Sequence, residues 1–314
     1  MAKNSVKMTE LPANLTLLEA AVAISRKLLP RPPHLTPGWC AAVASILEAT
    51  ARKPGNVTPD KNFTDLSYDE LCKAARAMVP AFDQGKAIPL GSIIKDAVSR
   101  SRSKTRSNAN LGIIIAISPL AAASLSSGRP LRAADVDSVI EQCTTQDSLN
   151  IYDAIKLSTA ASLSQRESFD IHGPAPESIQ QAMRHAATTE PTDSIAALWA
   201  FGYQSLWNSL LADLQFNESH GESWEQSIIF TALAQLARTP DSLIIRRHGR
   251  QQADQISSEA ADVLKLHHDD RTAAIEAFDW RLRHPCRINP GTTADLVAAA
   301  LYIHLWNSKF HELF

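Results

Sequence analysis

The chain has 314 residues and a formal net charge of −2, and 45% of its residues are hydrophobic. This length and apolar fraction are sufficient for one large buried core or two smaller ones. A nearly neutral chain has no global positive field, which disfavours DNA or another polyanion as its main partner and predicts no nucleic-acid binding. The four cysteines lie far apart without a CxxC pair, which argues against a zinc site or a disulfide framework.

Residues 1–35 are predicted to form an N-terminal helical arm. The stretch 17–29, LLEAAVAISRKLL, has apolar residues at spacings of three and four, the period of an amphipathic helix. The proline-rich stretch 28–39 follows it, so we treat 36–314 as a single all-helical domain. Because Glu19 interrupts the first apolar stretch, the start lacks the layout of a signal peptide, and we expect a cytoplasmic protein.

The rest of the chain is dominated by helical periodicity. The stretches 136–157 and 193–214 repeat the amphipathic pattern, whereas alternating strand patterns are scarce. The most apolar run is 111–125, LGIIIAISPLAAASL. Its Ile113–Ile117 part is compatible with a strand, but the run continues into Ala121–Ala123, which favours a buried helix, and it is too short for a membrane span. We therefore predict an all-α protein, an orthogonal bundle of roughly a dozen helices, without a membrane partner.

The first polar motif is LEATARKPGNV, residues 47–57. It places Glu48 and Lys53 on either side of a helix end, before a sharp turn at Pro54 and Gly55. Lys53 is a candidate phosphate ligand and Glu48 a candidate base. The alternative is a surface ion pair, since a lysine near a helix C-terminus also suits the helix dipole.

The second motif follows a loop of serines and basic residues and ends in SNANLG, residues 107–112. Alternating basic residues in such a loop are usually exposed to solvent without a specific role. The alternative is that their positive charge attracts a triphosphate to the site. Asn108 and Asn110 stand at the start of the most apolar helix. Their amides are suited to reading a nucleotide edge or to capping the helix.

Acidic residues mark three further places along the chain. Asp170 lies in a polar loop, Asp193 at a predicted helix start, and Asp241 five residues before Arg246 in DSLIIRRHG. No H-x-x-x-H, H-E-x-x-H, P-loop, GxGxxG or GxSxG pattern occurs. Zinc hydrolases, standard kinases, Rossmann enzymes and α/β-hydrolases are therefore disfavoured.

The last motif, NPGTTADL at 289–296, leads into an apolar helix. One interpretation is a capping box with Thr292 as N-cap and Asp295 at the third helical position. The other is a phosphate receptor made of helix amides and the hydroxyls of Thr292 and Thr293, with Asp295 holding a magnesium ion.

Taken in order, these motifs resemble the triphosphoribosyl-dephospho-CoA synthase family, in its broader branch ending in NPGTTADL. The resemblance spans about residues 40–305. It rests on E-x4-K-P-G-N-V (48–57), N-x-N-L-G-I (108–113), YDAIKL (152–157) followed by Asp170, DSIA (193–196), DSLIIRRHG (241–249) and NPGTTADLVAAAL (289–301). It implies an all-helical, ATP-dependent transferase. In this reaction the 2′-hydroxyl of 3′-dephospho-CoA attacks C1′ of the ATP ribose, and adenine leaves.

The resemblance also implies roles for particular residues. Glu48 and Asp170 are the candidate catalytic groups, as base or as stabiliser of an oxocarbenium-like transition state. The expected ATP-binding residues are Lys53, Asn56, Asn108, Asn110, Arg246, Asn289, Thr292 and Thr293. The expected Mg²⁺ ligands are Asp193, Asp241 and Asp295. The partners are then nucleotide and dephospho-CoA-like small molecules, and the six tryptophans and several apolar helices leave room for a homodimer interface.

The sequence departs from the family pattern at three places. Relatives carry His and then Asp after KPGNV, where this chain has Thr58 and Asn62, with Asp60 the only acid nearby. The usual N-T-N is N-A-N through Ala109, and R-Q-Y after DSIA is replaced by Ala-Leu-Trp at 197–199. Two alternatives stay open: a related transferase of one-carbon, methanopterin-type cofactor biosynthesis, and a non-catalytic nucleotide-binding helical protein.

Overall fold

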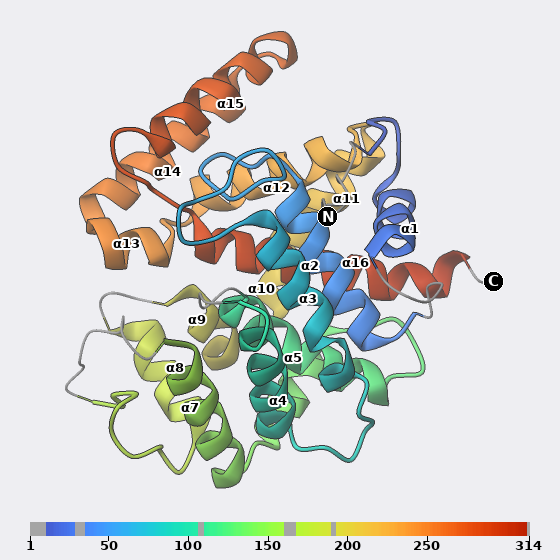
Figure 1. The fold of residues 1–314 in the computed structure, drawn as a ribbon, viewed down its shortest axis with the longest axis vertical. Coiled ribbons are helices and arrows are strands. Elements are labelled where there is room, and N and C mark those ends of the chain that lie inside the picture. The colour runs from blue at the N-terminus through green and yellow to red at the C-terminus, as the bar shows by residue number, and fades with distance from the viewer. Residues whose placement is uncertain (1–10, 29–34, 106–109, 160–167, 190–192, 313–314) are drawn as a thin grey trace, which may run out of the picture.

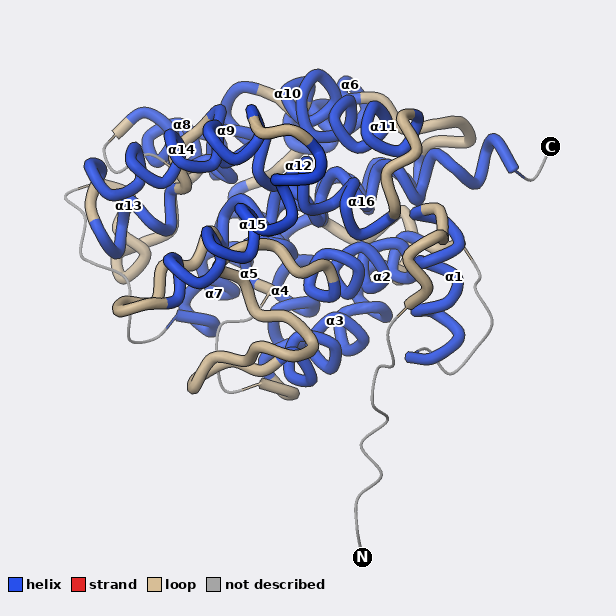
Figure 2. The backbone as a smooth tube through the Cα atoms, turned by 90° about the horizontal axis from the view of Figure 1, so that it is seen from above, coloured by secondary structure: helices blue, strands red, loops and turns tan. Residues whose placement is uncertain are grey.

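The computed structural model describes residues 11–28, 35–105, 110–159, 168–189 and 193–312. Within these residues the chain forms helices and no β-strand, which confirms the all-α prediction (Figures 1 and 2). The elements are α1 (Leu17–Leu28), α2 (Pro37–Thr50), α3 (Tyr68–Phe82), α4 (Leu90–Arg102), α5 (Leu111–Ser126), α6 (Ala133–Glu141), α7 (Thr145–Thr159), α8 (Ile179–Thr188), α9 (Ser194–Phe201), α10 (Gln204–Leu206), a π-helical turn (Trp207–Leu211), α11 (Ala212–Ser219), α12 (Trp224–Arg238), α13 (Ser242–His248), α14 (Arg250–Lys265), α15 (His268–Arg283) and α16 (Gly291–Glu312).

The helices α2, α5 and α16 form the centre of the molecule. Every residue of α2 is buried, which is typical of a helix surrounded by other helices. The helix α16 packs against α2, α5 and α12, and Figure 1 shows it crossing behind α2. The Tyr302 hydroxyl of α16 donates a hydrogen bond to Ser124 Oγ of α5 at 2.9 Å. This polar contact inside an apolar core fixes how the two helices are placed relative to each other.

The apolar run 111–125 is a buried helix, as predicted, and it continues through Pro119. Proline has no amide hydrogen, so the carbonyl of Ile115, four residues earlier, loses its partner within the helix. The Trp199 indole donates to that carbonyl at 3.2 Å, which satisfies it. Among the described residues, no single helix is long and apolar enough to span a membrane. The helices α12 and α13, which are bent by 59° relative to each other, reach the required length and apolarity only when they are taken as one segment.

The stretch 193–214 is not the continuous helix that its periodicity predicts. The helix α9 ends at Phe201, and its C-cap Gly202 has a φ of +94°, a conformation that residues with a side chain rarely adopt. The chain then restarts as α10, the π-helical turn and α11. The Tyr203 amide donates to Asp137 of α6 at 3.0 Å, so a tertiary contact supports the break. The stretch 136–157, in contrast, forms the pair α6 and α7 as expected.

The described part of the N-terminal arm packs on the body of the molecule. Leu17 and Ile24 of α1 are fully buried, and α1 packs against α2 and α12. The Trp39 indole of α2 donates to Ser25 Oγ of α1 at 2.7 Å. A boundary near residue 35 stays a prediction.

We expect Leu47→Ala, in the last turn of α2, to lower the free energy of unfolding by about 2–5 kcal/mol, because it removes a fully buried side chain and leaves a cavity. The matched control is Leu157→Ala, since the Leu157 side chain is 47% exposed and its loss should change stability by less than about 1 kcal/mol. Urea unfolding followed by circular dichroism measures both. Equal effects would show that α2 is not the core helix.

Candidate active site

Five segments far apart in the sequence meet around the carboxylate of Asp295, near the start of α16. The charges of Glu48 from α2, Asp193 from the start of α9 and Asp241 from the start of α13 all act on Asp295. Arg246 in α13 supplies an opposing positive charge. From α5, Gly112 lies so close to Asp295 that a Cβ atom there would meet Oδ2 at 2.0 Å. The structure therefore brings together most of the acids that the motifs singled out.

The buried carboxylate of Asp241 caps two helices at once. Its Oδ1 accepts from the amides of Leu243 (2.9 Å) and Ile244 (3.1 Å), at the start of its own helix α13. Its Oδ2 accepts from the Thr293 amide (2.7 Å) and hydroxyl (2.8 Å), in the first turn of α16. Burial raises the pKa of Asp241, while the hydrogen bonds from Thr293, Ile244 and Leu243 lower it. This side chain holds the two helix starts together.

The predicted capping box in NPGTTADL is wrong. The helix α16 begins at Gly291, so Thr292 lies within its first turn. The Thr292 hydroxyl accepts from Ser242 Oγ at 2.9 Å, and the first-turn amide of Thr293 is capped by Asp241 from another helix. Asp295 is consequently free of the capping role that the local sequence indicated.

Asp193 joins α9 to α13. Its Oδ1 accepts from the amides of Ile195 (2.9 Å) and Ala196 (3.1 Å), so it is the N-cap of α9. Its Oδ2 pairs with Arg246 Nη1 at 2.7 Å. Both side chains are between a quarter and a third exposed, which leaves this ion pair accessible from solvent.

Glu48 and Lys53 form a buried ion pair, not the surface pair of the alternative interpretation. The Lys53 Nζ lies 2.8 Å from Glu48 Oε1, and the two side chains are 1% and 7% exposed. Lys53 Nζ also donates to the backbone carbonyls of Glu48 and Ala51. Because these protein groups already hold the ammonium, the role of Lys53 as a phosphate ligand stays a prediction.

The turn after Lys53 is tied to the loop before α16. Gly55 has a φ of +77°, and its amide donates to Asp279 Oδ1 of α15 at 2.8 Å. Asn56 Nδ2 donates to Asn289 Oδ1 at 2.8 Å. The motifs KPGNV and NPGTTADL, more than two hundred residues apart, therefore share one wall. No sequence motif indicated Asp279, since its role depends on where α15 packs.

Two polar side chains in this region, those of Asp295 and Asn110, have groups for which the described residues provide no partner. Along the described chain, Asp295 makes no ion pair or hydrogen bond, and Asn110 Nδ2 is buried without a partner. Burial, and then the charges of Glu48, Asp241 and Asp193, raise the pKa of Asp295 well above its usual range. Asn110 has a φ of +68° and precedes α5, so it stands two residues before Gly112. Unsatisfied groups of this kind in one region point to a ligand site.

The remaining predicted site residues are placed differently. Asp170 lies in the loop between α7 and α8, where its carboxylate accepts from the His172 amide at 2.7 Å. Asn108 lies outside the described residues. In the described parts of the chain, no group of three His, Cys, Asp or Glu side chains is arranged to hold a metal ion. Asp193, Asp241 and Asp295 are thus not a preformed metal centre.

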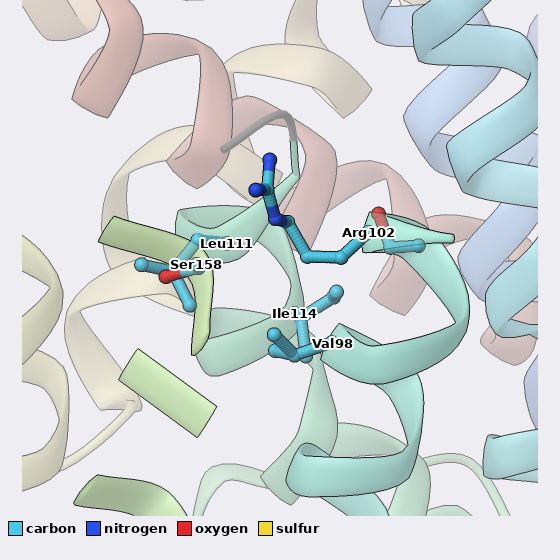
Figure 3. A pocket seen from close by; sticks show the side chains of 6 residues that line it. Val98, Arg102, Leu111, Ile114 and Ser158 are labelled. Carbon is cyan, nitrogen blue, oxygen red and sulfur yellow. The ribbon is translucent and has the colours of Figure 1, made fainter. Parts of the chain in front are cut away.

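Two small hollows lie near these residues. One, with a cavity volume of about 10 Å³, is lined by Lys53, Asn56, Leu236, Pro290 and Thr293 among others. The other lies between the end of α4 and the start of α5, where Figure 3 shows Arg102 opposite Leu111 and Ser158, with Ile114 and Val98 below. The volume of the first is far below the roughly 300–1,000 Å³ of typical ligand pockets, so binding of a nucleotide requires the surrounding side chains to move apart.

Fold and site together define an all-helical protein with a clustered acidic and basic site at the starts of several helices. A family model for ATP:dephospho-CoA triphosphoribosyl transferases, CitG, matches residues 35–313. The chain therefore belongs to this family and is a triphosphoribosyl transferase.

A solved structure shares the fold. It is a crystal structure of an Archaeoglobus fulgidus protein assigned as a triphosphoribosyl-dephospho-CoA synthase, with a TM-score of 0.57 and 22% sequence identity. The match covers 74% of this chain and 97% of that one. The comparison with curated proteins found no match.

We expect Asp241→Asn to lower the free energy of unfolding by about 2–4 kcal/mol. The side-chain NH₂ group of the asparagine would replace one of the two accepting oxygens and would face backbone N–H donors at the start of α13 or α16. The control is Asp254→Asn, which alters an exposed i,i+4 pair with Arg250 and should change stability by less than about 1 kcal/mol. Urea denaturation provides both values. A loss no larger than that of the control would contradict the double cap.

Asp295→Asn should raise the melting temperature of the metal-free protein. The folded-state pKa of Asp295 lies above its unfolded value, so its ionisation destabilises the folded state increasingly as pH rises. The stabilising effect of the substitution should therefore be larger at pH 8 than at pH 5. Calorimetric melting in the presence of EDTA tests this, and a lower melting temperature at pH 8 would show that Asp295 is stabilised by a partner.

Proposed function

We propose that the cluster around Asp295 is the site at which the triphosphoribosyl group of ATP is transferred to 3′-dephospho-CoA. The observation that carries this proposal is the carboxylate of Asp295, which lies among three other acids and has no partner in the described parts of the chain. A fold does not keep such a group for stability, because an uncompensated, partly buried charge is destabilising. It is typical of a binding or catalytic group.

The reaction needs a carboxylate beside the ribose. The C1′–N9 bond of ATP breaks and adenine leaves, while the 2′-hydroxyl oxygen of the acceptor forms the new bond to C1′ and gives up its proton. Positive charge develops on the ribose, and a nearby carboxylate stabilises it. Glu48, held in place by Lys53 and close enough to act on Asp295, is our candidate for this stabilisation and for accepting the proton.

The site also fits a magnesium ion that arrives with the triphosphate. The carboxylates of Glu48, Asp193, Asp241 and Asp295 outnumber the cations Lys53 and Arg246, so a divalent cation would balance the local charge. Mg²⁺ commonly uses one or two protein carboxylates together with phosphates and water, so three converging ligands are not required. Asp295 is our first candidate ligand, since both Asp241 oxygens already accept hydrogen bonds. When bound, the ion would neutralise phosphate charge.

The start of α16 is our candidate for holding phosphates. The positive end of a helix attracts anions. The Thr292 hydroxyl accepts from Ser242 and keeps its own hydrogen for a phosphate, whereas the amide and hydroxyl of Thr293 already donate to Asp241. Arg246 lies nearby with an accessible guanidinium group. Asn56 and Asn289, joined to each other, and Asn110 would orient the nucleoside. Tight anchoring of the triphosphate would place C1′ for attack.

Asp295→Asn should reduce adenine release from ATP and 3′-dephospho-CoA by at least about 100-fold, since it removes the charge at the centre of the cluster. Chromatographic detection of free adenine with Mg²⁺ present measures the rate. Asp254→Asn should keep the wild-type rate.

The same assay separates the alternatives. ATP binding in calorimetry without adenine release would contradict the proposal. Release with another acceptor, such as a methanopterin-type precursor, and none with dephospho-CoA would favour the one-carbon alternative.

A further inference from the structure

A group of cationic side chains, called the outer residues below, is linked to the Asp295 cluster through Arg246. It is formed by Lys61, Arg247, Arg283 and Arg287, which come from the loop after KPGNV, α13, α15 and the loop before α16. Arg246 connects it to the cluster, because its charge acts on both Arg247 and Asp295. None of the three arginines Arg247, Arg283 and Arg287 was singled out as a phosphate ligand above.

Two of these arginines are held around one aromatic ring. The guanidinium carbon of Arg287 lies 4.5 Å from the centre of the Phe63 ring, and that of Arg283 lies 5.8 Å from it. Arg287 also pairs with Asp65, whose side chain is largely exposed. Arg283 pairs with Asp279 at 2.9 Å. Stacking and ion pairing restrict both guanidinium groups, so they are preorganised for an anion.

Arg247 is the cation of this group that has no carboxylate partner. Within the described residues, no Asp or Glu lies at ion-pair distance from it, and its side chain is exposed in the last turn of α13. Partial burial, and then the positive charges of Arg287 and Arg246, lower its pKa, whereas Asp65 raises it. Like charges are therefore gathered here at the expense of stability, which is typical of a surface that binds an anion.

The proposed reaction explains why a second anion locus is needed. ATP and dephospho-CoA are both polyanions, and they must lie next to each other for attack at C1′. Two phosphate chains in one place repel each other, and the inner carboxylates add to that repulsion. Among the outer residues, four cations face the two carboxylates Asp65 and Asp279, so positive charge is in excess there.

We propose that Arg247 and Arg287, beside Phe63, bind the diphosphate group of the acceptor, and that they do not bind the triphosphate of ATP. This rests on the proposed function. The diphosphate of dephospho-CoA is a diester without a terminal phosphate, so paired guanidinium groups neutralise it without a metal. The triphosphate, in contrast, would be held with Mg²⁺ among the inner carboxylates. The site is thus divided into an inner, metal-dependent half and an outer, arginine-dependent half.

The test is steady-state adenine release by Arg247→Gln and Arg287→Gln, with each substrate varied in turn. We expect the KM for 3′-dephospho-CoA to rise about 10-fold or more, since each substitution removes a charge-assisted contact. The KM for ATP should stay within about 2-fold, and Arg247→Lys, which keeps the charge, should recover part of the loss. Arg129→Gln, which alters an exposed pair with Asp135 at the start of α6, is the control and should keep both values.

The outcomes separate this proposal from the proposed function. If the wild type is active but both variants keep its KM for dephospho-CoA, or raise both KM values equally, the division is wrong while the reaction stands. If the wild type releases no adenine, calorimetric titration with dephospho-CoA alone decides. Binding that weakens in both variants but not in Arg129→Gln supports the anion site, and equal or absent binding overturns it.

Discussion

The capping of two helices by the carboxylate of Asp241 is the interaction on which the arrangement of the site depends. It accepts from amides of α13 through one oxygen and from Thr293 of α16 through the other. Since α16 also packs against α2 and α5, fixing its start fixes the positions of Glu48 and Gly112 relative to Asp295. One buried side chain thereby connects the central core to the chemistry of the site.

This arrangement gives the acids in the site different tasks. Asp193 and Asp241 accept hydrogen bonds from helix starts, and Glu48 is held by Lys53, so each is compensated within the protein. Asp295 receives the repulsion of all three without a partner among the described residues. The negative charges of these three acids make an ionised Asp295 unfavourable, and a bound cation or a positive charge that develops on the substrate would reduce this repulsion. In our account the structural and the chemical roles of carboxylates are separated in this way.

The fold class was predictable from the sequence because helical periodicity is a local property. The apolar run of α5 was correctly predicted as a helix, since its length favoured a helix over a strand. The break at Gly202 was not predictable, because the contact of Tyr203 with Asp137 that supports it is tertiary. The N-cap predicted at Thr292 was wrong for the same reason. The amide of Thr293 is capped by Asp241, which lies fifty-two residues earlier in the chain.

The site was partly predictable, because motifs far apart in the chain met as their resemblance to one family implied. Examples are the hydrogen bond between the Asn56 and Asn289 side chains and the group of acids around Asp295. Asp279 and the arginines around Phe63 carry no motif and emerged only from packing.

The most direct test of this account is a crystal structure of the wild-type protein with ATP and Mg²⁺. We predict phosphate density at the start of α16, with the metal beside Asp295 and the ribose near Glu48. Nucleotide bound elsewhere, with Asp295 still without a partner, would contradict the account.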